Sequence, residues 1–175
     1  MPSIRRADHR DAPALAEIAE RTFRQAFGAM NTVEDMDLHC RGHFGEAAQA
    51  AEIADASMHT LLCEHEGTLL GFAQLRWSDA PGCVAANAPG EIYRLYVAAD
   101  WQGRGVADDL MSACLRSMHR HGSDVAWLGV WERNPRAIAF YRRSGFVEVG
   151  EQSFRLGTDL QRDLVMARQV VGPNP

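Results

Sequence analysis

The amino-acid sequence predicts an α/β (α+β) fold: a mixed, mostly antiparallel central sheet with flanking helices. In the second half of the chain, strand-like runs rich in β-branched and aromatic side chains occur at 92–97 (IYRLYV) and 125–131 (VAWLGVW). Between them, apolar residues recur at three- and four-residue steps from Val106 to Met118, as in an amphipathic helix. Such a helical crossover should make the two strands parallel neighbours with a right-handed connection.

The first half predicts an opening strand, several helices and then two paired strands. Asp11 can cap the first helix, with Pro13 in its first turn, and Thr32 begins a second helix with capping-box spacing. The tight turn at 65–67 joins two strand-like runs. The predicted elements are a strand at 3–7, helices from 12, from 32 and at 47–56, and strands at 58–64 and 68–77.

The second half follows a proline- and glycine-containing loop. Asn134 is a favoured N-cap and Pro135 suits the first helical position, while Gly145 ends that helix. The predicted elements are a loop at 78–89, a strand at 92–97, a helix at 106–121, a strand at 125–131, a helix at 134–144, and strands at 146–149 and 163–168.

Length and composition indicate a single domain spanning residues 1–175, with an ordered fold over about 3–168 and a tail at 169–175. No apolar run approaches the roughly 20 residues that cross a bilayer, and no signal-peptide core is visible. The cysteines form no CxxC pair, so we expect free thiols and a cytoplasmic protein. The net charge of −5 disfavours nucleic-acid binding and is compatible with a cationic substrate.

The turn that follows the strand at 92–97 predicts an anion site. Its residues 102–107 (QGRGVA) lead directly into the long helix, whose N-terminus carries partial positive charge. Gly103 and Gly105 allow a ligand to approach the backbone closely. The pattern is neither a Rossmann fingerprint, because Asp108 takes the place of the third glycine, nor a P-loop.

This turn resembles the Q/R-x-x-G-x-G/A signature of the GNAT acetyltransferases. A second stretch, residues 131–146, resembles the family's Asn-x-x-Ala-x-x-Phe-Tyr-x-x-x-Gly-Phe motif. The matching residues are Asn134, Ala137, Phe140, Tyr141, Gly145 and Phe146. The resemblance covers about residues 3–168 and implies the GNAT fold, with a splayed pair of central parallel strands and acetyl-CoA as the cofactor.

The end of the chain is similar to the bacterial PaiA-type spermidine and spermine N-acetyltransferases. The similarity lies in Phe154, Leu156, Gly157, Gln161, Asp163 and Met166. It implies an acetyl-CoA-dependent N-acetyltransferase that acts on a polyamine by direct attack of the amine. The open alternatives are another small amine, a protein N-terminus, an acetyl-cysteine route, or a non-catalytic acyl-CoA sensor. By analogy with the family, a homodimer is expected.

The resemblance also implies roles for particular residues. Tyr141 is the candidate general acid, since a phenol stays protonated at neutral pH. Glu91, eleven residues before Gln102, is the candidate base, either directly or through water, or else a solvated carboxylate. Tyr93, two residues further along the strand, should point to the same face and line the site.

Cofactor binding is expected at the phosphate turn and along the preceding strand. The residues are Leu95, Tyr96 and Val97, through backbone pairing with pantetheine, and Gln102, Gly103, Arg104, Gly105, Val106 and Ala107 at the phosphates. Asn134 either holds the pantetheine arm or only caps its helix. Arg143, like Arg142, either reaches the phosphates or is solvated.

Acidic residues near the second helix are candidates for binding a polycation. These are Glu34, Asp35 and Asp37, although a capped, solvated helix start is the simpler reading. His39 and His43 are spaced like two metal ligands, but no third ligand is evident, so we expect a solvated helix face and no metal.

Overall fold

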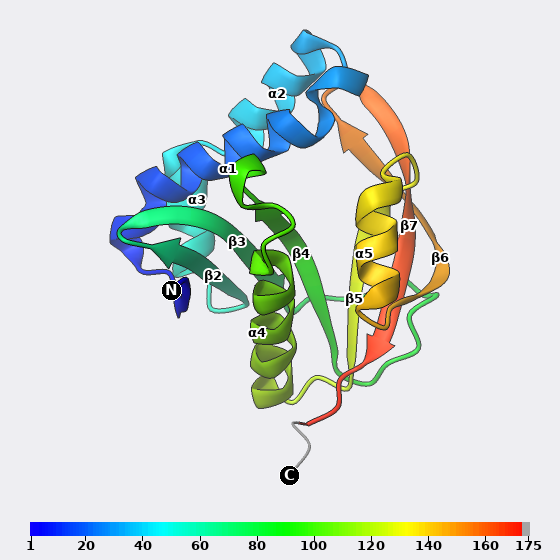
Figure 1. Ribbon diagram of the computed structural model, residues 1–175. Helices are drawn as coiled ribbons and strands as arrows, with labels where there is room; N and C mark the ends of the chain where they lie inside the picture. The colour runs from blue at the N-terminus through cyan, green and yellow to red at the C-terminus, as the bar shows by residue number, and fades with distance from the viewer. Residues whose placement is uncertain (173–175) are drawn as a thin grey trace.

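The computed structural model describes residues 1–172, and its central feature is a seven-stranded sheet with strand order β1-β2-β3-β4-β5-β7-β6. Every neighbouring pair is antiparallel except β4 and β5 (Figure 1). The strands are β1 Ser3–Arg6, β2 Met58–His65, β3 Thr68–Arg76, β4 Pro89–Val97, β5 Val125–Trp131, β6 Val147–Leu156 and β7 Asp159–Gln169. The predicted mixed, mostly antiparallel sheet with one parallel pair is confirmed.

Helices cover both faces of this sheet. The α-helices are α1 Ala12–Phe27, α2 Val33–His43, α3 Glu46–Ala54, α4 Val106–His121 and α5 Pro135–Arg143. Short 3-10 helices occupy His9–Asp11, Gly28–Met30 and Ala99–Trp101. None of the helices in residues 1–172 is long and apolar enough to span a bilayer.

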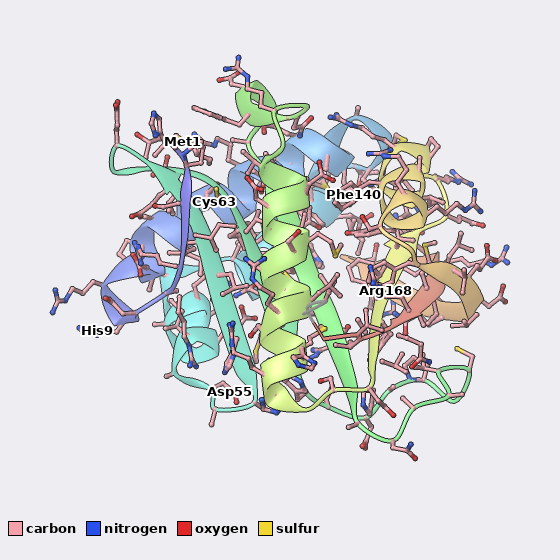
Figure 2. All side chains as sticks on the ribbon, turned by 60° about the horizontal axis from the view of Figure 1, so that its bottom comes forward. Met1, His9, Asp55, Cys63, Phe140 and Arg168 are labelled. Atoms are coloured by element: carbon pink, nitrogen blue, oxygen red, sulfur yellow. The ribbon has the colours of Figure 1, made fainter. Side chains whose placement is uncertain are left out.

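The hydrophobic core has one layer on each side of the sheet. On one face, α4 buries a stripe that includes Leu110, Cys114 and Met118, and α5 adds Ile138. Figure 2 shows α4 lying across the front of the sheet, with Phe140 of α5 to one side. On the other face, α1 and α2 pack a second cluster around Phe72. Each fully buried leucine contributes about 1.5–3 kcal/mol.

The parallel strands β4 and β5 are paired along only a short stretch. Their register joins Pro89–Glu91 to Val125–Trp127 and continues no further. Beyond this stretch β4 remains paired with β3, and β5 remains paired with β7 (Figure 1). The two strands therefore diverge towards their carboxyl ends, and the polar backbone groups on their facing edges have no strand partner there.

A β-bulge in β4 changes which side chains share a face. Arg94 is opposite Gln74, whereas Ile92 is opposite Leu75, so Tyr93 is the extra residue. The bulge brings Glu91 and Arg94, three positions apart, to the same face. Tyr93 lies on that face as well, because its ring contacts guanidinium groups there.

The last two strands are longer than predicted. Residues 146–149 and 163–168 were expected, but β6 runs over Val147–Leu156 and β7 over Asp159–Gln169. β6 is an edge strand whose side chains are mostly exposed, and its middle residues 150–153 (GEQS) include no apolar side chain that would indicate a continuous strand. The predicted tail begins at 169, which is still in β7, and residues 173–175 lie outside the described part of the chain.

Candidate active site

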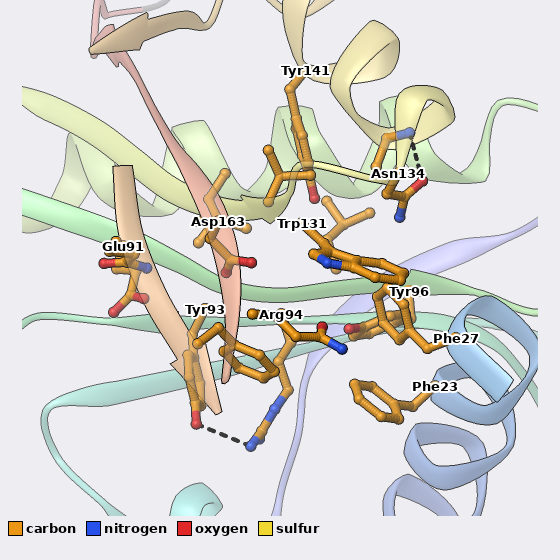
Figure 3. A pocket seen from close by; sticks show the side chains of 18 of the residues that line it. Phe23, Phe27, Glu91, Tyr93, Arg94, Tyr96, Trp131, Asn134, Tyr141 and Asp163 are labelled. Carbon is orange, nitrogen blue, oxygen red and sulfur yellow. Dashed lines mark hydrogen bonds between the residues drawn. The ribbon is translucent and has the colours of Figure 1, made fainter. Parts of the chain in front are cut away.

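A cavity opens where β4 and β5 diverge. Its walls are the carboxyl halves of both strands, the start of α5, the end of α1 and the β6–β7 hairpin. Figure 3 shows polar side chains on one side of this space and aromatic rings on the other. Several residues singled out by the sequence line the cavity: Glu91, Tyr93, Leu95, Tyr96, Asn134 and Tyr141.

Tyr141 projects from α5 into the cavity (Figure 3). Its ring packs edge-on against Phe140 and Phe146, which fixes its direction. Its hydroxyl has no hydrogen-bond partner among residues 1–172, so it is available to a ligand. Burial raises the pKa of Tyr141 above its ordinary value. The phenol therefore stays protonated at neutral pH and can donate a proton.

Glu91 belongs to a charged network. Its Oε2 accepts a hydrogen bond from Nε of Arg76 at 2.7 Å, and its side chain is buried. Burial raises the pKa of Glu91, while Arg76 and Arg94 act in the opposite direction. A carboxylate that neutralises an arginine is a weaker proton acceptor than its position alone suggests.

Tyr93 lies between the two arginines of this network. The guanidinium carbon of Arg76 is 3.9 Å from the centre of its ring, and that of Arg94 is 4.3 Å away. Arg94 also donates to Tyr93 Oη at 3.2 Å and to Glu52 at 2.7 Å. Both arginines thus have carboxylate partners.

Asp163, on β7, is a cavity residue whose role the sequence analysis missed. It was noted there only as part of a subgroup pattern. Its side chain is 7% exposed, lines the cavity, and has no hydrogen bond or ion pair within residues 1–172. Burial alone raises the pKa of Asp163 to about 6. Asp163 is thus the one carboxylate lining the cavity, in the described part of the chain, that no arginine neutralises.

The predicted phosphate turn has the required backbone geometry. Gly103 and Gly105 have φ of 75° and 86°, a left-handed conformation that favours glycine. Helix α4 begins directly after Gly105, and no side chain caps it. The first four N–H groups of an α-helix lack helical partners, so this end can bind phosphate oxygens. A Cβ at either glycine would meet no heavy atom within 4 Å, so the protein leaves this approach open.

In the turn, the Gln102 side chain makes supporting hydrogen bonds and the Arg104 side chain carries a positive charge. Gln102 donates to the carbonyl of Val97 at 3.0 Å and accepts from Arg136 of α5 at 2.5 Å. It therefore ties the turn to β4 and α5. Arg104 lies 5.3 Å from the ring centre of Trp101. The contribution of Arg136 was missed because it depends on the approach of α5.

Val106 and Ala107 form the first turn of α4, and Val106 is buried in the core. Their contribution to an anion site is therefore through backbone N–H groups. Arg143 lies at the end of α5, with its guanidinium carbon 5.8 Å from the ring centre of Phe140, and does not line the cavity. Arg142 lies 3.9 Å from Glu148.

Asn134 caps helix α5, which is one of the two roles expected for it. Its Oδ1 accepts the N–H of Ala137 at 3.2 Å (Figure 3). Its side-chain nitrogen makes no hydrogen bond within residues 1–172, and the residue lines the cavity. The cap thus leaves a donor available to a ligand.

Replacing Asn134 by alanine should destabilise the protein by about 1 kcal/mol, because the cap of α5 is lost. For a chain of this size, that corresponds to a fall in Tm of about 2–4 °C, measurable by scanning calorimetry. Asn87→Ala is the control, since that side chain is exposed in a loop. Equal melting temperatures for the two variants would contradict a capping role.

Glu34 and Asp35 lie outside the cavity lining. Asp35 accepts hydrogen bonds from the backbone N–H and hydroxyl of Thr158, at 2.6 and 2.8 Å, and so connects α2 to the β6–β7 turn. Glu34 lies exposed in the first turn of α2.

The expectation of a solvated His39 is wrong. His39 is buried and stacks on Phe23 with ring centres 4.5 Å apart. Burial lowers the pKa of His39 to about 4, so the ring is neutral and acts as a packing group. Its neighbour His43 lies 4.4 Å away, ring centre to ring centre.

Comparison with known proteins identifies the family to which this chain belongs. Residues 13–146 match the model of the Acetyltransferase (GNAT) family. The chain is 32% identical over 161 residues to an uncharacterized N-acetyltransferase of Mycobacterium bovis, covering 92% of this chain and 99% of that protein. It is 29% identical over 168 residues to another from Lactobacillus delbrueckii subsp. lactis, covering 96% and 97% of the two chains.

Among solved structures, the chain is similar to the PaiA N-acetyltransferase of Thermoplasma acidophilum in complex with coenzyme A. The TM-score is 0.79 at 20% identity, with 97% of this chain and 99% of that chain covered. It is also similar to the ribosomal-protein-S18-alanine N-acetyltransferase of Escherichia coli, at a TM-score of 0.69 and 18% identity, covering 99% and 97%. These structural matches support the fold.

The family match and the fold define an acyltransferase. The chain belongs to the GNAT acetyltransferase family. It is an N-acetyltransferase, and acetyl-CoA is its donor.

Proposed function

We propose that this protein acetylates a primary amine of a polyamine such as spermidine or spermine, in the cytoplasm. The observation that carries the proposal is the charge balance of the cavity. Arg76 and Arg94 are each paired with a glutamate, and within residues 1–172 Asp163 has no cation partner. An ammonium group is the natural partner for a buried carboxylate of this kind. The net charge of −5 also favours the approach of a polycation.

The donor would lie along the diverging strands. The backbone of Leu95, Tyr96 and Val97 would pair with the pantetheine amides, and the turn from Gln102 to Ala107 would bind the phosphates. This assignment rests on the unpaired edge of β4 and on the uncapped start of α4. The thioester would then lie near Tyr141, which donates a proton to the departing thiolate.

The burial of Cys114 and the position of Cys83 favour direct attack of the amine over an acetyl-cysteine route. Burial raises the pKa of Cys114 to about 12, and the side chain is fully buried in the core, so it is no nucleophile at neutral pH. Cys83 is exposed in the loop between β3 and β4 and does not line the cavity. Neither thiol can therefore carry an acetyl group within the cavity.

The proposal is tested by measuring thiol release from acetyl-CoA with spermidine, spermine, aminoglycosides, amino acids and short peptides. Saturable turnover that is greatest with the polyamines is the expected result. Turnover only with another small amine or a peptide N-terminus would refute the polyamine assignment and keep the N-acetyltransferase. Tight acetyl-CoA binding without turnover would favour an acyl-CoA sensor.

A further inference from the structure

We infer that Asp163 binds the ammonium group of the acceptor and takes its proton, so that the amine is neutral when it attacks the thioester. The inference deepens the proposed function, and it rests on acetyl transfer to an amine rather than on the polyamine assignment. It replaces the sequence-based hypothesis that Glu91 is the base.

Asp163 lies in the sheet between two other residues that line the cavity. In the sheet, Asp163 is opposite Trp131 of β5 on one side and Gln152 of β6 on the other. All three residues line the cavity. In Figure 3 the carboxylate of Asp163 and the hydroxyl of Tyr141 point into the same space beside Trp131. An amine held by Asp163 would therefore lie in the space that the Tyr141 hydroxyl also faces.

Gly129 leaves space beside the Asp163 carboxylate. Gly129 of β5 is next to Asp163, and a Cβ at Gly129 would lie 3.1 Å from Asp163 Oδ2 and 2.6 Å from Gln152 Nε2. Any larger residue would press on both side chains. The absence of a side chain at Gly129 therefore leaves room for the Asp163 carboxylate in the wall of the cavity.

The negative charge of Asp163 is not compensated by any cation within residues 1–172. A carboxylate on a residue that is only 7% exposed, without an ion pair or hydrogen bond within residues 1–172, is costly to ionise. Binding of the acceptor's ammonium group would offset this cost. Asp163 would then have a cationic partner, as Glu91 already has in Arg76. Burial raises the pKa of Asp163 to about 6, which suits a group that must accept a proton near neutral pH.

The proton balance of the transfer is complete with these groups. The Asp163 carboxylate takes one proton from R–NH3⁺, and the neutral nitrogen forms a bond to the thioester carbonyl carbon. The C–S bond breaks, and the thiolate takes the proton of the Tyr141 hydroxyl. The second proton lost by the nitrogen restores Tyr141, and Asp163 passes its proton to water. The products are the amide, CoA-SH and H⁺.

Asp163→Asn is the test, because it keeps the shape of the side chain and removes the charge. We expect kcat/KM to fall about 100-fold for whichever amine the protein accepts, a loss typical of a proton acceptor. Glu91→Gln should reduce it less. Asp79→Asn, the same chemical change at an exposed loop position, is the matched control and should change it less than twofold.

The pH profile gives a second readout. In the wild type, log kcat/KM should fall as pH decreases through about 6, where Asp163 becomes protonated, and the Asn variant should lose this limb. The other charged or titratable groups that face the cavity are Arg76, Glu91, Tyr93, Arg94, Tyr96 and Tyr141. Of these, Glu91 alone is a carboxylate, so the profile of Glu91→Gln assigns the limb to one residue or the other.

A third readout needs no acceptor turnover. The pKa of Asp163 is about 6 in the folded protein, compared with the ordinary value of 3.8 expected for the unfolded chain. The folded protein therefore binds a proton at Asp163 more tightly than the unfolded chain does. The contribution of Asp163 to stability should therefore fall as pH rises from about 4 to above 6, so the difference in stability between wild type and Asp163→Asn should change across this range. Butylammonium, a minimal cation, should bind the CoA-loaded wild type at least 10-fold more tightly than the variant.

The outcomes separate the two proposals. Activity with peptides alone, still lost in Asp163→Asn, refutes the polyamine assignment and supports the role of Asp163. Unchanged kcat/KM and an unchanged acid limb in the variant overturn the inference and leave the acetyltransferase standing. If no amine on the panel reacts, equal butylammonium binding by wild type and variant overturns it as well.

Discussion

Replacing Tyr141 by phenylalanine should lower kcat about 100-fold while leaving the affinity for acetyl-CoA within twofold of the wild type. The hydroxyl forms no hydrogen bond within residues 1–172, and the ring packing against Phe140 and Phe146 is kept, so the fold should be unchanged. What is lost is the proton for the departing thiolate, a contribution typically worth 10²–10⁴-fold. Steady-state kinetics and calorimetric titration with CoA measure the two quantities.

The same variant distinguishes an enzyme from a sensor. A thioester with a better leaving group than CoA needs less protonation, so the defect of Tyr141→Phe should shrink with such a donor. If kcat of the variant equals that of the wild type, the Tyr141 hydroxyl takes no part in the acetyl-transfer reaction. A variant with a lower Tm and weaker CoA binding would mean that the hydroxyl has a structural role instead.

Replacing Gly105 by valine should weaken CoA binding by more than 10-fold. Gly105 has φ of 86° at the start of α4, and the new side chain would both strain this backbone and project where the phosphates are expected. The left-handed conformation should cost about 1–2 kcal/mol of stability. Titration calorimetry measures the affinity, and thermal unfolding measures the strain.

The same helix provides the matched control. Gly122 ends α4 with φ of 88°, and a Cβ there would also meet no heavy atom within 4 Å. Gly122→Val should therefore lower Tm by a similar amount without changing the affinity for CoA. Equal losses of affinity in both variants would mean that helix stability, and not the open backbone of the phosphate turn, governs cofactor binding.

The parts of the site that could be predicted are those encoded by neighbours in the sequence. The strand–turn–helix unit depends on two glycines, Gly103 and Gly105, that are separated by one residue and lie just before the helix. The position of Tyr141 follows from a helix whose cap and apolar spacing are local. Both features can be predicted without knowing which distant segments are in contact. The parallel pairing of β4 and β5 follows from the strand–helix–strand order of the chain.

The parts that could not be predicted depend on pairing between distant segments. Glu91 reads as a free carboxylate in the sequence, and only the β3–β4 register places Arg76 against it. In the sequence, Asp163 is one polar residue in a predicted strand. Its lack of a charged partner within residues 1–172 depends on its neighbours on β5 and β6. The bulge at Tyr93 likewise depends on the partner strand, because strand alternation alone gives no sign of an extra residue.

The short pairing of β4 with β5 has a consequence for stability. Three residue pairs form the direct backbone connection between one half of the sheet, β1 to β4, and the other, β5 to β7. A donor whose amides pair with β4 along its free edge would supply part of the missing connection. Binding to the folded protein alone stabilises it by about 2.7 kcal/mol when the free ligand is at 100 times its Kd. The resistance of this protein to unfolding, and hence to proteolysis, should therefore rise and fall with the supply of acetyl-CoA.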